Sequence, residues 1–199
     1  MLEYWNHNTA FHPLILRHAR RSGGRSLDVG CGDGLLVRRL AAVSDHVTGV
    51  EPDPRALAVA TARTEGLANV TLAPWGLLDH PDDGTSYDLV TLVAVLHHMD
   101  LRAGLLRARS LVAPGGRLVV VGLAANRTRL DWIVSGLTIP VARTMGVLRR
   151  ETDPEVVFAD PVETLAEIRA TARELMPEVR IRRALYYRYV LSWTRPAQA

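Results

Sequence analysis

The part of this sequence best suited to chemistry is a turn with three glycines at every second position. Leu27 to Gly34 runs Leu-Asp-Val-Gly-Cys-Gly-Asp-Gly, so an apolar stretch leads into Gly30, Gly32 and Gly34. Such a turn calls for positive φ angles, and the lack of a Cβ lets a ligand lie against the backbone. A helical pattern of leucines follows at once, so the free N–H groups at the helix start would face the same ligand. A purely structural turn is the alternative, because a glycine-rich match by itself is weak support for a site.

A carboxylate follows this turn at the spacing expected of a ribose ligand. Glu51 stands 21 residues after Gly30, at the carboxyl end of a predicted strand over 45–50. There it can accept hydrogen bonds from both hydroxyls of a ribose that the glycine turn holds. The alternative is a carboxylate that only stabilises the start of the next helix. Asp53 fits that second role better, since it precedes Pro54 and is a good N-cap.

A pair of histidines lies at the end of a long apolar stretch. Residues 87–95 are almost continuously apolar, which is typical of a central strand covered on both faces. His97 and His98 follow it, at the same predicted sheet edge as the glycine turn and Glu51. Ligands of open α/β sheets bind at that edge. The alternative is a structural pair in which one ring is hydrogen-bonded to a neighbouring helix.

Alternating strands and helices would position these groups. The pattern from residue 26 to 123 predicts a doubly wound parallel sheet with helices on both faces, in the α/β class. After it, a helix is predicted over 161–176, followed by two strands whose short connection implies an antiparallel pair at the sheet edge. The predicted strands cover residues 26–29, 45–50, 69–72, 87–95, 117–123, 180–185 and 187–193.

Composition limits what the protein can do. Its 199 residues suit a single domain, and no apolar run reaches the roughly 18 to 20 residues of a membrane span. The first residues lack the charged start and apolar run of a signal peptide, so a cytoplasmic protein is expected. Cys31, the single cysteine, excludes an internal disulfide and a multi-cysteine metal site. We expect no metal, and the net charge of only +3 argues against a nucleic-acid partner.

In four motifs the chain resembles the class I S-adenosylmethionine-dependent methyltransferases of the small, single-domain type. The motifs are LDVGCGDG at 27–34, VTGVEPDP at 47–54, YDLVTLVAVLHHM at 87–99 and APGGRLVVVG at 113–122. The resemblance implies a Rossmann-like fold with a seven-stranded, mostly parallel sheet and a single domain over 1–199. Its parts would be an N-terminal lid and helix (1–24), a cofactor-binding core (25–123), a substrate-side insertion (124–160) and the last helix with the antiparallel strands (161–199).

The family implies a role for each matching residue. Gly30, Cys31 and Gly32 would face the methionine part of S-adenosyl-L-methionine, which becomes S-adenosyl-L-homocysteine after the reaction. Asp28 would hold the ammonium group of the cofactor, directly or through water. The backbone at Val93 would meet the same ammonium group.

The adenosine half of the cofactor is matched less completely. Glu51 would bind the ribose, and Pro52 would pack on the adenine. The family usually has an acidic residue after its third strand to bind the adenine amino group, but this chain has Ala-Pro-Trp-Gly at 73–76. The replacements we consider are the carboxylate of Asp79, the backbone of Gly76 and Leu77, and stacking by Trp75. An equally good alternative for Trp75 is a structural role, in which the side chain only anchors the loop.

The chemistry of methyl transfer asks little of the side chains. A sulfonium carries its methyl group to a nucleophile in line, so holding the two at near-attack distance in a site cleared of water supplies most of the rate. A general base is needed only if the acceptor must lose a proton early. His98 falls on the family's histidine position and is the first candidate for that base. His97 and His12 are the second candidates.

The expected acceptor is a small organic or lipid-like molecule. Its pocket would be built by the N-terminal aromatic cluster, the insertion over 124–160, and Tyr186 and Tyr187 at the start of the last strand. The N-terminal aromatic cluster, which would form a lid or else pack on the domain edge, consists of Tyr4, Trp5, His7, Phe11 and His12. The apolar residues of the insertion are Trp132, Ile133, Ile139, Met145 and Val147. These residues fit a protein core or the face of a homodimer equally well.

Two other functions share part of these motifs. A nicotinamide-dependent oxidoreductase would need G-x-G-x-x-G, but Leu35 stands where the third glycine of that pattern belongs. A non-catalytic protein that binds S-adenosylmethionine, or a scaffold, is the second alternative. Calorimetry with the cofactor and turnover assays on a panel of acceptors separate these functions.

Overall fold

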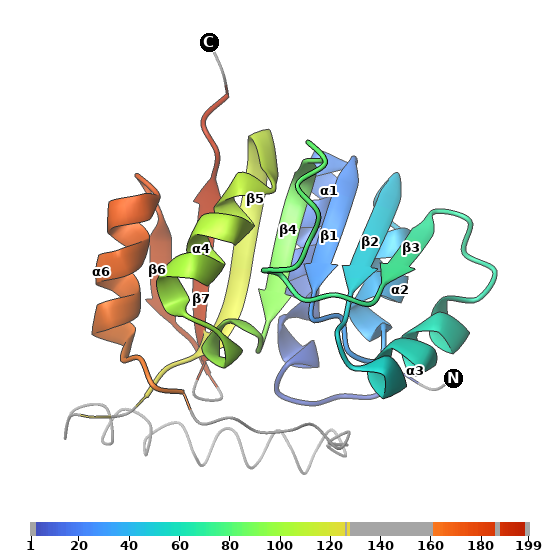
Figure 1. The fold of residues 1–199 in the computed structure, drawn as a ribbon, viewed down its shortest axis with the longest axis horizontal. Coiled ribbons are helices and arrows are strands. Elements are labelled where there is room, and N and C mark those ends of the chain that lie inside the picture. Colours follow the sequence, from blue (N-terminus) through green and yellow to red (C-terminus); the bar gives the residue numbers. More distant parts are fainter. Residues whose placement is uncertain (1–2, 126, 128–160, 186–187, 198–199) are drawn as a thin grey trace.

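Within residues 3–125, 127, 161–185 and 188–197, which the computed structural model describes, the strands form one seven-stranded sheet (Figure 1). Its strand order is β3-β2-β1-β4-β5-β7-β6. The strands are β1 Arg25–Val29, β2 His46–Val50, β3 Val70–Ala73, β4 Tyr87–Val93, β5 Val112–Leu123, β6 Arg180–Arg183 and β7 Arg188–Thr194. The predicted fold is confirmed, with β4 at the centre and β6 and β7 as an antiparallel pair.

The parallel register brings the ends of four strands to the same height. Val29, the last residue of β1, is paired with Val50 of β2 and Leu92 of β4. Val50 is paired in turn with Ala73, the last residue of β3. The segments that follow these residues therefore start side by side at the carboxyl edge of the sheet, where ligands of such sheets bind.

Helices cover both faces of the sheet (Figure 1). On one face lie α1 (His12–Ser22), α2 (Leu35–Ala41) and α3 (Pro54–Thr64), preceded by the 3-10 turn η1 (Thr9–Phe11). The other face carries α4 (Leu101–Ser110), which follows the 3-10 turn η2 (Leu96–His98), and α6 (Leu165–Leu175). Each face has its own apolar core between helices and sheet.

The position of β4 at the centre of the sheet explains why its sequence is so apolar. Leu89 packs in the core beneath α1 and α2, whereas Val90 and Leu92 pack in the core beneath α4 and α6. Successive side chains of a strand point to opposite faces, and both faces of β4 are covered. Burying each of these side chains contributes about 1.5–3 kcal/mol.

Capping side chains set the starts of two helices. Asp53 accepts a hydrogen bond from the Arg55 N–H at 2.9 Å and caps α3, as predicted. Thr164 and Glu167 form a capping box, so α6 begins at Leu165 instead of residue 161.

Three strands differ from the predicted boundaries by two residues or more. β6 ends at Arg183 and not at residue 185. β4 ends at Val93 and not at residue 95, because Ala94 has a φ of 58° and turns the chain out of the strand. β5 begins at Val112 and not at residue 117, because Val112 already pairs with Tyr87 ahead of an irregularity in the register. The predicted acceptor-side residues Trp132, Ile133, Ile139, Met145, Val147, Tyr186 and Tyr187 lie outside the described residues.

Candidate active site

The glycine turn joins β1 to α2 and leaves one stretch of backbone open. Gly34 has a φ of 77°, and a Cβ built on it would lie 2.9 Å from the Cα of Ala60 in α3. A Cβ on Gly30 would collide with the side chain of Val95. At Gly32, with a φ of 54°, a Cβ would meet no atom within 4 Å. Two of the glycines are thus needed for packing, and Gly32 is where a ligand can approach the backbone.

Glu51 holds this turn through backbone hydrogen bonds. Its Oε2 accepts from the N–H of Gly32 at 2.9 Å, and its Oε1 accepts from the N–H of Asp53 at 3.0 Å. The side chain is partly buried, and each carboxylate oxygen retains a second lone pair that a ribose hydroxyl can use. Glu51 therefore braces the turn and faces the same ligand space. The sequence suggested a ribose ligand or a carboxylate at the helix start, but not the bond to Gly32.

Asp28 lies behind the turn as a buried carboxyl group. It is 2% exposed, and its Oδ1 accepts a hydrogen bond from the Thr91 hydroxyl at 2.7 Å. Burial, with a smaller contribution from the negative charge of Glu51, raises the pKa of Asp28 to about 7 against the lowering effect of the Thr91 hydrogen bond. A positively charged ligand group nearby would favour the ionised carboxylate.

Cys31 is a packed thiol. It is buried, and its Sγ would lie 3.1 Å from a Cβ built on Gly49. Burial, reinforced by the charge of Asp28, raises the pKa of the Cys31 thiol well above its usual range. The side chain therefore has no nucleophilic character, and only its backbone can face a ligand.

The end of β4 is locked against the glycine turn. Ala94 adopts a φ of 58°, a left-handed conformation that costs a residue with a Cβ about 1–2 kcal/mol. Its N–H donates to the carbonyl of Val121 in β5 at 2.7 Å, which holds the kink. The kink directs Val95 onto Gly30 and leaves the carbonyl end of Val93 at the sheet edge. No sequence signal marks this turn, because alanine is rare in the left-handed region.

His97 and His98 stand on η2 immediately after this kink. The ring centroids are 4.1 Å apart, and His98 is exposed whereas His97 is partly buried. Burial, with smaller contributions from the neighbouring His98 and Arg188, lowers the pKa of His97 to about 4. The buried Nδ1 of His97 has no hydrogen-bond partner in the described part of the chain. The ring is therefore neutral at pH 7 and retains an unused ring nitrogen.

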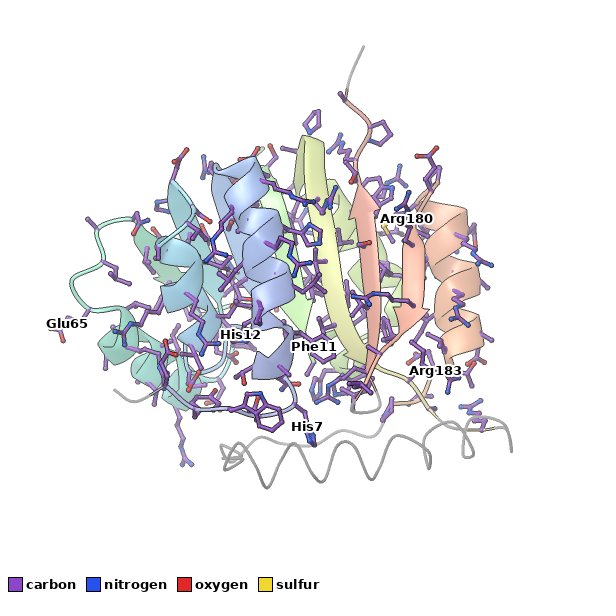
Figure 2. The ribbon with its side chains drawn as sticks, turned by 180° about the vertical axis from the view of Figure 1, so that it is seen from behind. His7, Phe11, His12, Glu65, Arg180 and Arg183 are labelled. Atoms are coloured by element: carbon purple, nitrogen blue, oxygen red, sulfur yellow. The ribbon has the colours of Figure 1, made fainter. Side chains whose placement is uncertain are left out.

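His12 has a different environment. It is the first residue of α1 (Figure 2), and its Nδ1 accepts a hydrogen bond from Nη1 of Arg39 in α2 at 2.8 Å. Burial and the Arg39 charge lower its pKa to about 3. Arg39 also pairs with Glu3 at 3.2 Å. This arrangement ties the N-terminal segment to α2 and favours a structural role for His12 over a catalytic one.

The loop after β3 borders the same edge, since the N–H of Glu51 donates to the carbonyl of Ala73 at 3.1 Å. Trp75 packs partly buried against the core, and its Nε1 is buried without a partner among the described residues. Leu77 points into the core, so only its backbone can meet a ligand. The carboxylate of Asp79 is on an exposed residue, with Oδ2 3.4 Å from a Cβ position on Gly76. Pro52 is exposed beside Glu51.

Sequence reasoning missed a polar cluster that joins the N-terminus to the turn. Arg63 of α3 donates through Nη2 to Oδ2 of Asp33, which lies between Gly32 and Gly34, at 2.8 Å. Burial and the nearby Asp33 carboxylate raise the pKa of the Tyr4 hydroxyl, and the Arg63 guanidinium lies 5.7 Å from the Tyr4 ring. The N-terminal aromatic cluster was predicted as a lid, and Tyr4 does reach the turn.

Comparison with known proteins identifies the family. A family model described as "Methyltransferase domain" matches residues 27–118. An uncharacterised methyltransferase of Mycobacterium tuberculosis is 34% identical over 203 residues, which cover 96% of this chain and 98% of the relative. This chain belongs to the class I S-adenosylmethionine-dependent methyltransferases. A ubiquinone biosynthesis O-methyltransferase of Burkholderia ambifaria is 31% identical over 188 residues, 84% of this methyltransferase and 76% of the relative.

Solved structures share the fold of this methyltransferase. The N-methyltransferase NodS from Bradyrhizobium japonicum, in complex with S-adenosyl-L-homocysteine, has a TM-score of 0.65 at 19% identity, covering 94% of this chain and 87% of its own. Magnesium protoporphyrin IX methyltransferase from Synechocystis, with bound S-adenosylmethionine, has a TM-score of 0.61 at 19% identity, covering 95% and 79%.

The described part of the methyltransferase offers no group of three or more His, Cys, Asp or Glu side chains that could hold a metal ion. None of its described helices is long and apolar enough to cross a membrane.

Proposed function

We propose that this methyltransferase transfers a methyl group from S-adenosyl-L-methionine to an oxygen, nitrogen or carbon nucleophile of a small organic acceptor. The observation that carries the cofactor part is the open backbone at Gly32, within a turn braced by Glu51 and backed by Asp28. These groups fit an α-amino acid joined to a ribose better than a pyrophosphate, because two carboxyl groups border the cradle.

Each half of the cofactor has residues suited to it. Gly30, Cys31 and Gly32 offer backbone to the methionine moiety, and Asp28 and the carbonyl end of Val93 suit its ammonium group. When bound, the cofactor supplies an electrophilic methyl group on a sulfonium. The protein residues only have to orient the two reactants and exclude water.

The adenosine half is served by the ends of β2 and β3. Glu51 has lone pairs free for the ribose hydroxyls, and the exposed Pro52 ring can pack on the adenine. Trp75 offers a buried Nε1–H without a partner in the described chain, and Asp79 and the backbone of Gly76 and Leu77 lie on the same loop.

Histidine assistance is proposed for acceptors that must lose a proton. His98 is exposed at the sheet edge, and the neutral His97 ring lies beside it with an unused Nδ1. The exposed His98 ring can take a proton from an acceptor hydroxyl or amine, and His97, with a pKa of about 4, is the weaker base. His12, whose Nδ1 already accepts from Arg39, has the weaker claim.

The acceptor stays a prediction. A small organic or lipid-like molecule is favoured by the apolar sequence of the insertion over 124–160. The Burkholderia relative is named as an O-methyltransferase and NodS as an N-methyltransferase, so both nucleophiles belong in the panel of acceptors. A homodimer and a cytoplasmic location likewise stay predictions.

Calorimetry with S-adenosyl-L-homocysteine tests the proposal. Glu51→Ala removes the carboxylate that accepts from the Gly32 N–H and that would bind the ribose. We therefore expect the Kd of this variant for S-adenosyl-L-homocysteine to rise about tenfold to a hundredfold over that of the parent. Asp53→Ala serves as the matched control, since this carboxylate caps α3 without bonding the turn, and its Kd should stay within about twofold.

No binding of the cofactor product at millimolar concentration would contradict the proposal. Binding without methyl transfer to any acceptor of the panel would support the non-catalytic alternative instead.

A further inference from the structure

Among the described helices, none covers the β7 and β6 end of the sheet face that carries α1, although Val190 of β7 is buried in the same core as Ile15. α1 contacts β4 and β5, and its Ile15 and Ala19 pack in the same core as Val119 and Val121 of β5. α6 packs on the opposite face. In Figure 2, which views the molecule from the α1 side, no helix of the described residues stands in front of β7 or β6.

Register places three arginines on this uncovered face. Val119 is paired with Ser192 of β7, and Ser192 is paired with Arg180 of β6. Paired residues of neighbouring strands project to the same face of a sheet, so Arg180 lies on the α1 side with Val119. Side chains two residues apart on a strand project to the same face, so Arg182 of β6 and Arg117 of β5 also lie on the α1 side.

Helix α1 adds two more arginines beside them. Arg17 and Arg21 are four residues apart and share one side of the helix with His18. Nη1 of Arg117 donates to Nδ1 of His18 at 2.8 Å, so this side of the helix meets the arginines of the sheet. Burial lowers the pKa of His18, and the charges that add to this effect are those of Arg117, Arg21 and Arg17, all positive.

These five arginines form what we call the basic face: Arg17, Arg21, Arg117, Arg180 and Arg182. Within the described residues none of the five makes an ion pair with a carboxylate, whereas Arg39, Arg63, Arg102 and Arg107 each do. The polar residues between them, Ser192 and Thr194, carry no charge. Like charges held on one face repel each other, so an anionic partner would stabilise this arrangement.

We propose that the basic face docks an acidic helix of a partner protein. In an α/β fold helices cover both faces of the sheet, and a helix laid on β7 and β6 beside α1 would complete this layer. Helices have a diameter of about 10 Å, so such a helix would stand level with α1 and present acidic side chains to the arginines below it. This inference is independent of the methyl-transfer chemistry.

Other anionic partners fit the face less well. A planar membrane would meet α1 first. Of the large exposed apolar residues of the described chain, Val59, Leu78, Leu106 and Val162 lie away from this face, and only Leu185, in the connection between β6 and β7, is near it. Single-stranded nucleic acid needs aromatic side chains for stacking. The aromatic residues of β7, Tyr189 and Trp193, project into the opposite core.

The test uses fluorescence anisotropy with a labelled Glu- and Ala-rich peptide of about 20 residues, long enough to be helical on its own. The double variant Arg180→Glu/Arg182→Glu should weaken its binding about tenfold or more at low salt, and rising salt should weaken binding to the parent protein. The control, Arg169→Glu/Arg173→Glu on α6, changes the net charge equally on the opposite face and should alter binding by less than about twofold. Calorimetry with S-adenosyl-L-homocysteine checks that both variants keep the parent's cofactor affinity.

Several outcomes would overturn the proposal. Equal weakening by both double variants would mean non-specific attraction by net charge. A peptide of the same charge broken by prolines that binds as tightly would exclude helix docking. Binding only to vesicles of 30% phosphatidylglycerol in phosphatidylcholine would assign the face to lipid. If the parent protein sediments as a dimer and the Arg180→Glu/Arg182→Glu variant as a monomer, the face would instead be occupied by a second copy of this chain.

Discussion

At the carboxyl edge of the sheet, the ends of β1 and β2 offer mainly backbone groups to a ligand. Glu51 holds the N–H groups of Gly32 and Asp53, and the glycines leave room for a ligand. At the β4 end the chain is held by a strained alanine and by contacts between distant segments, and the groups that face outward are histidine rings. We call the ends of β1 and β2 the proposed cofactor half, which offers mainly backbone groups, and the end of β4 the proposed acceptor half, which offers histidine side chains.

The largest expected effect concerns the tight packing of the cofactor half. Gly34→Ala adds a Cβ that would lie 2.9 Å from α3, so we expect a loss of about 3 kcal/mol of unfolding free energy. Gly66→Ala is the matched control, because Gly66 has a similar φ of 81° but an open Cβ position, and it should cost only about 1 kcal/mol. Denaturant unfolding measures both. Equal losses would mean that backbone strain alone, without close packing, accounts for the turn.

Asp28 should show opposite effects on stability and binding. Its pKa of about 7 in the folded protein lies above the usual value, so ionised Asp28 destabilises the fold increasingly as pH rises from about 4 to 7. Asp28→Asn should therefore raise the thermal stability of the cofactor-free protein at pH 8 and change it little at pH 4. The same variant should weaken S-adenosyl-L-homocysteine binding at pH 8 about tenfold. A variant that is less stable at both pH values would refute the buried-charge account.

The histidines test the acceptor half alone. His98→Gln should lower turnover about tenfold on an acceptor that must lose a proton, while cofactor affinity stays unchanged. His97→Gln, measured in parallel, reports whether the buried neighbour contributes. A fall in turnover of less than about threefold for His98→Gln, with cofactor affinity intact, would remove this residue as the base.

The smallest expected effect concerns the link between the N-terminus and the turn. Tyr4→Phe removes the hydroxyl near Asp33 and keeps the ring beside Arg63, so the Kd for S-adenosyl-L-homocysteine should rise about twofold to threefold. Tyr87→Phe is the control, since it removes a tyrosine hydroxyl that is hydrogen-bonded to His80 at 3.4 Å and not to the glycine turn. An unchanged Kd in both variants would confine Tyr4 to a structural role.

The contrast between local patterns and long-range packing also explains which features could be predicted from the sequence. The sheet, the place of β4 and the cap at Asp53 follow from apolar periodicity and local capping preferences, which act over a few residues. Glu51 was found because its distance from Gly30 is fixed by one helix and one strand. Three features could not be predicted: the kink at Ala94, the bond of Glu51 to Gly32, and the cluster of Asp33, Arg63 and Tyr4.

The missed features share a physical cause. Each depends on which groups meet after folding, and no local pattern encodes the meeting of Tyr4 with Arg63 or of Val95 with Gly30. The choice among Trp75, Asp79 and the backbone of Gly76 and Leu77 for the adenine is also of this kind. Sequence spacing brings all of them to one loop but does not say which atoms face the ligand.

The order of the last two strands has a consequence for synthesis. β7 follows β6 in the chain but lies between β5 and β6 in the sheet. A growing chain that has not yet released Arg188–Thr194 from the ribosome therefore exposes the hydrogen-bonding edge of β5, with its run of valines from 119 to 121, and β6 has no strand to join. An open apolar edge of this kind pairs readily with other chains. We expect the newly made protein to depend on chaperones until its final strand is inserted.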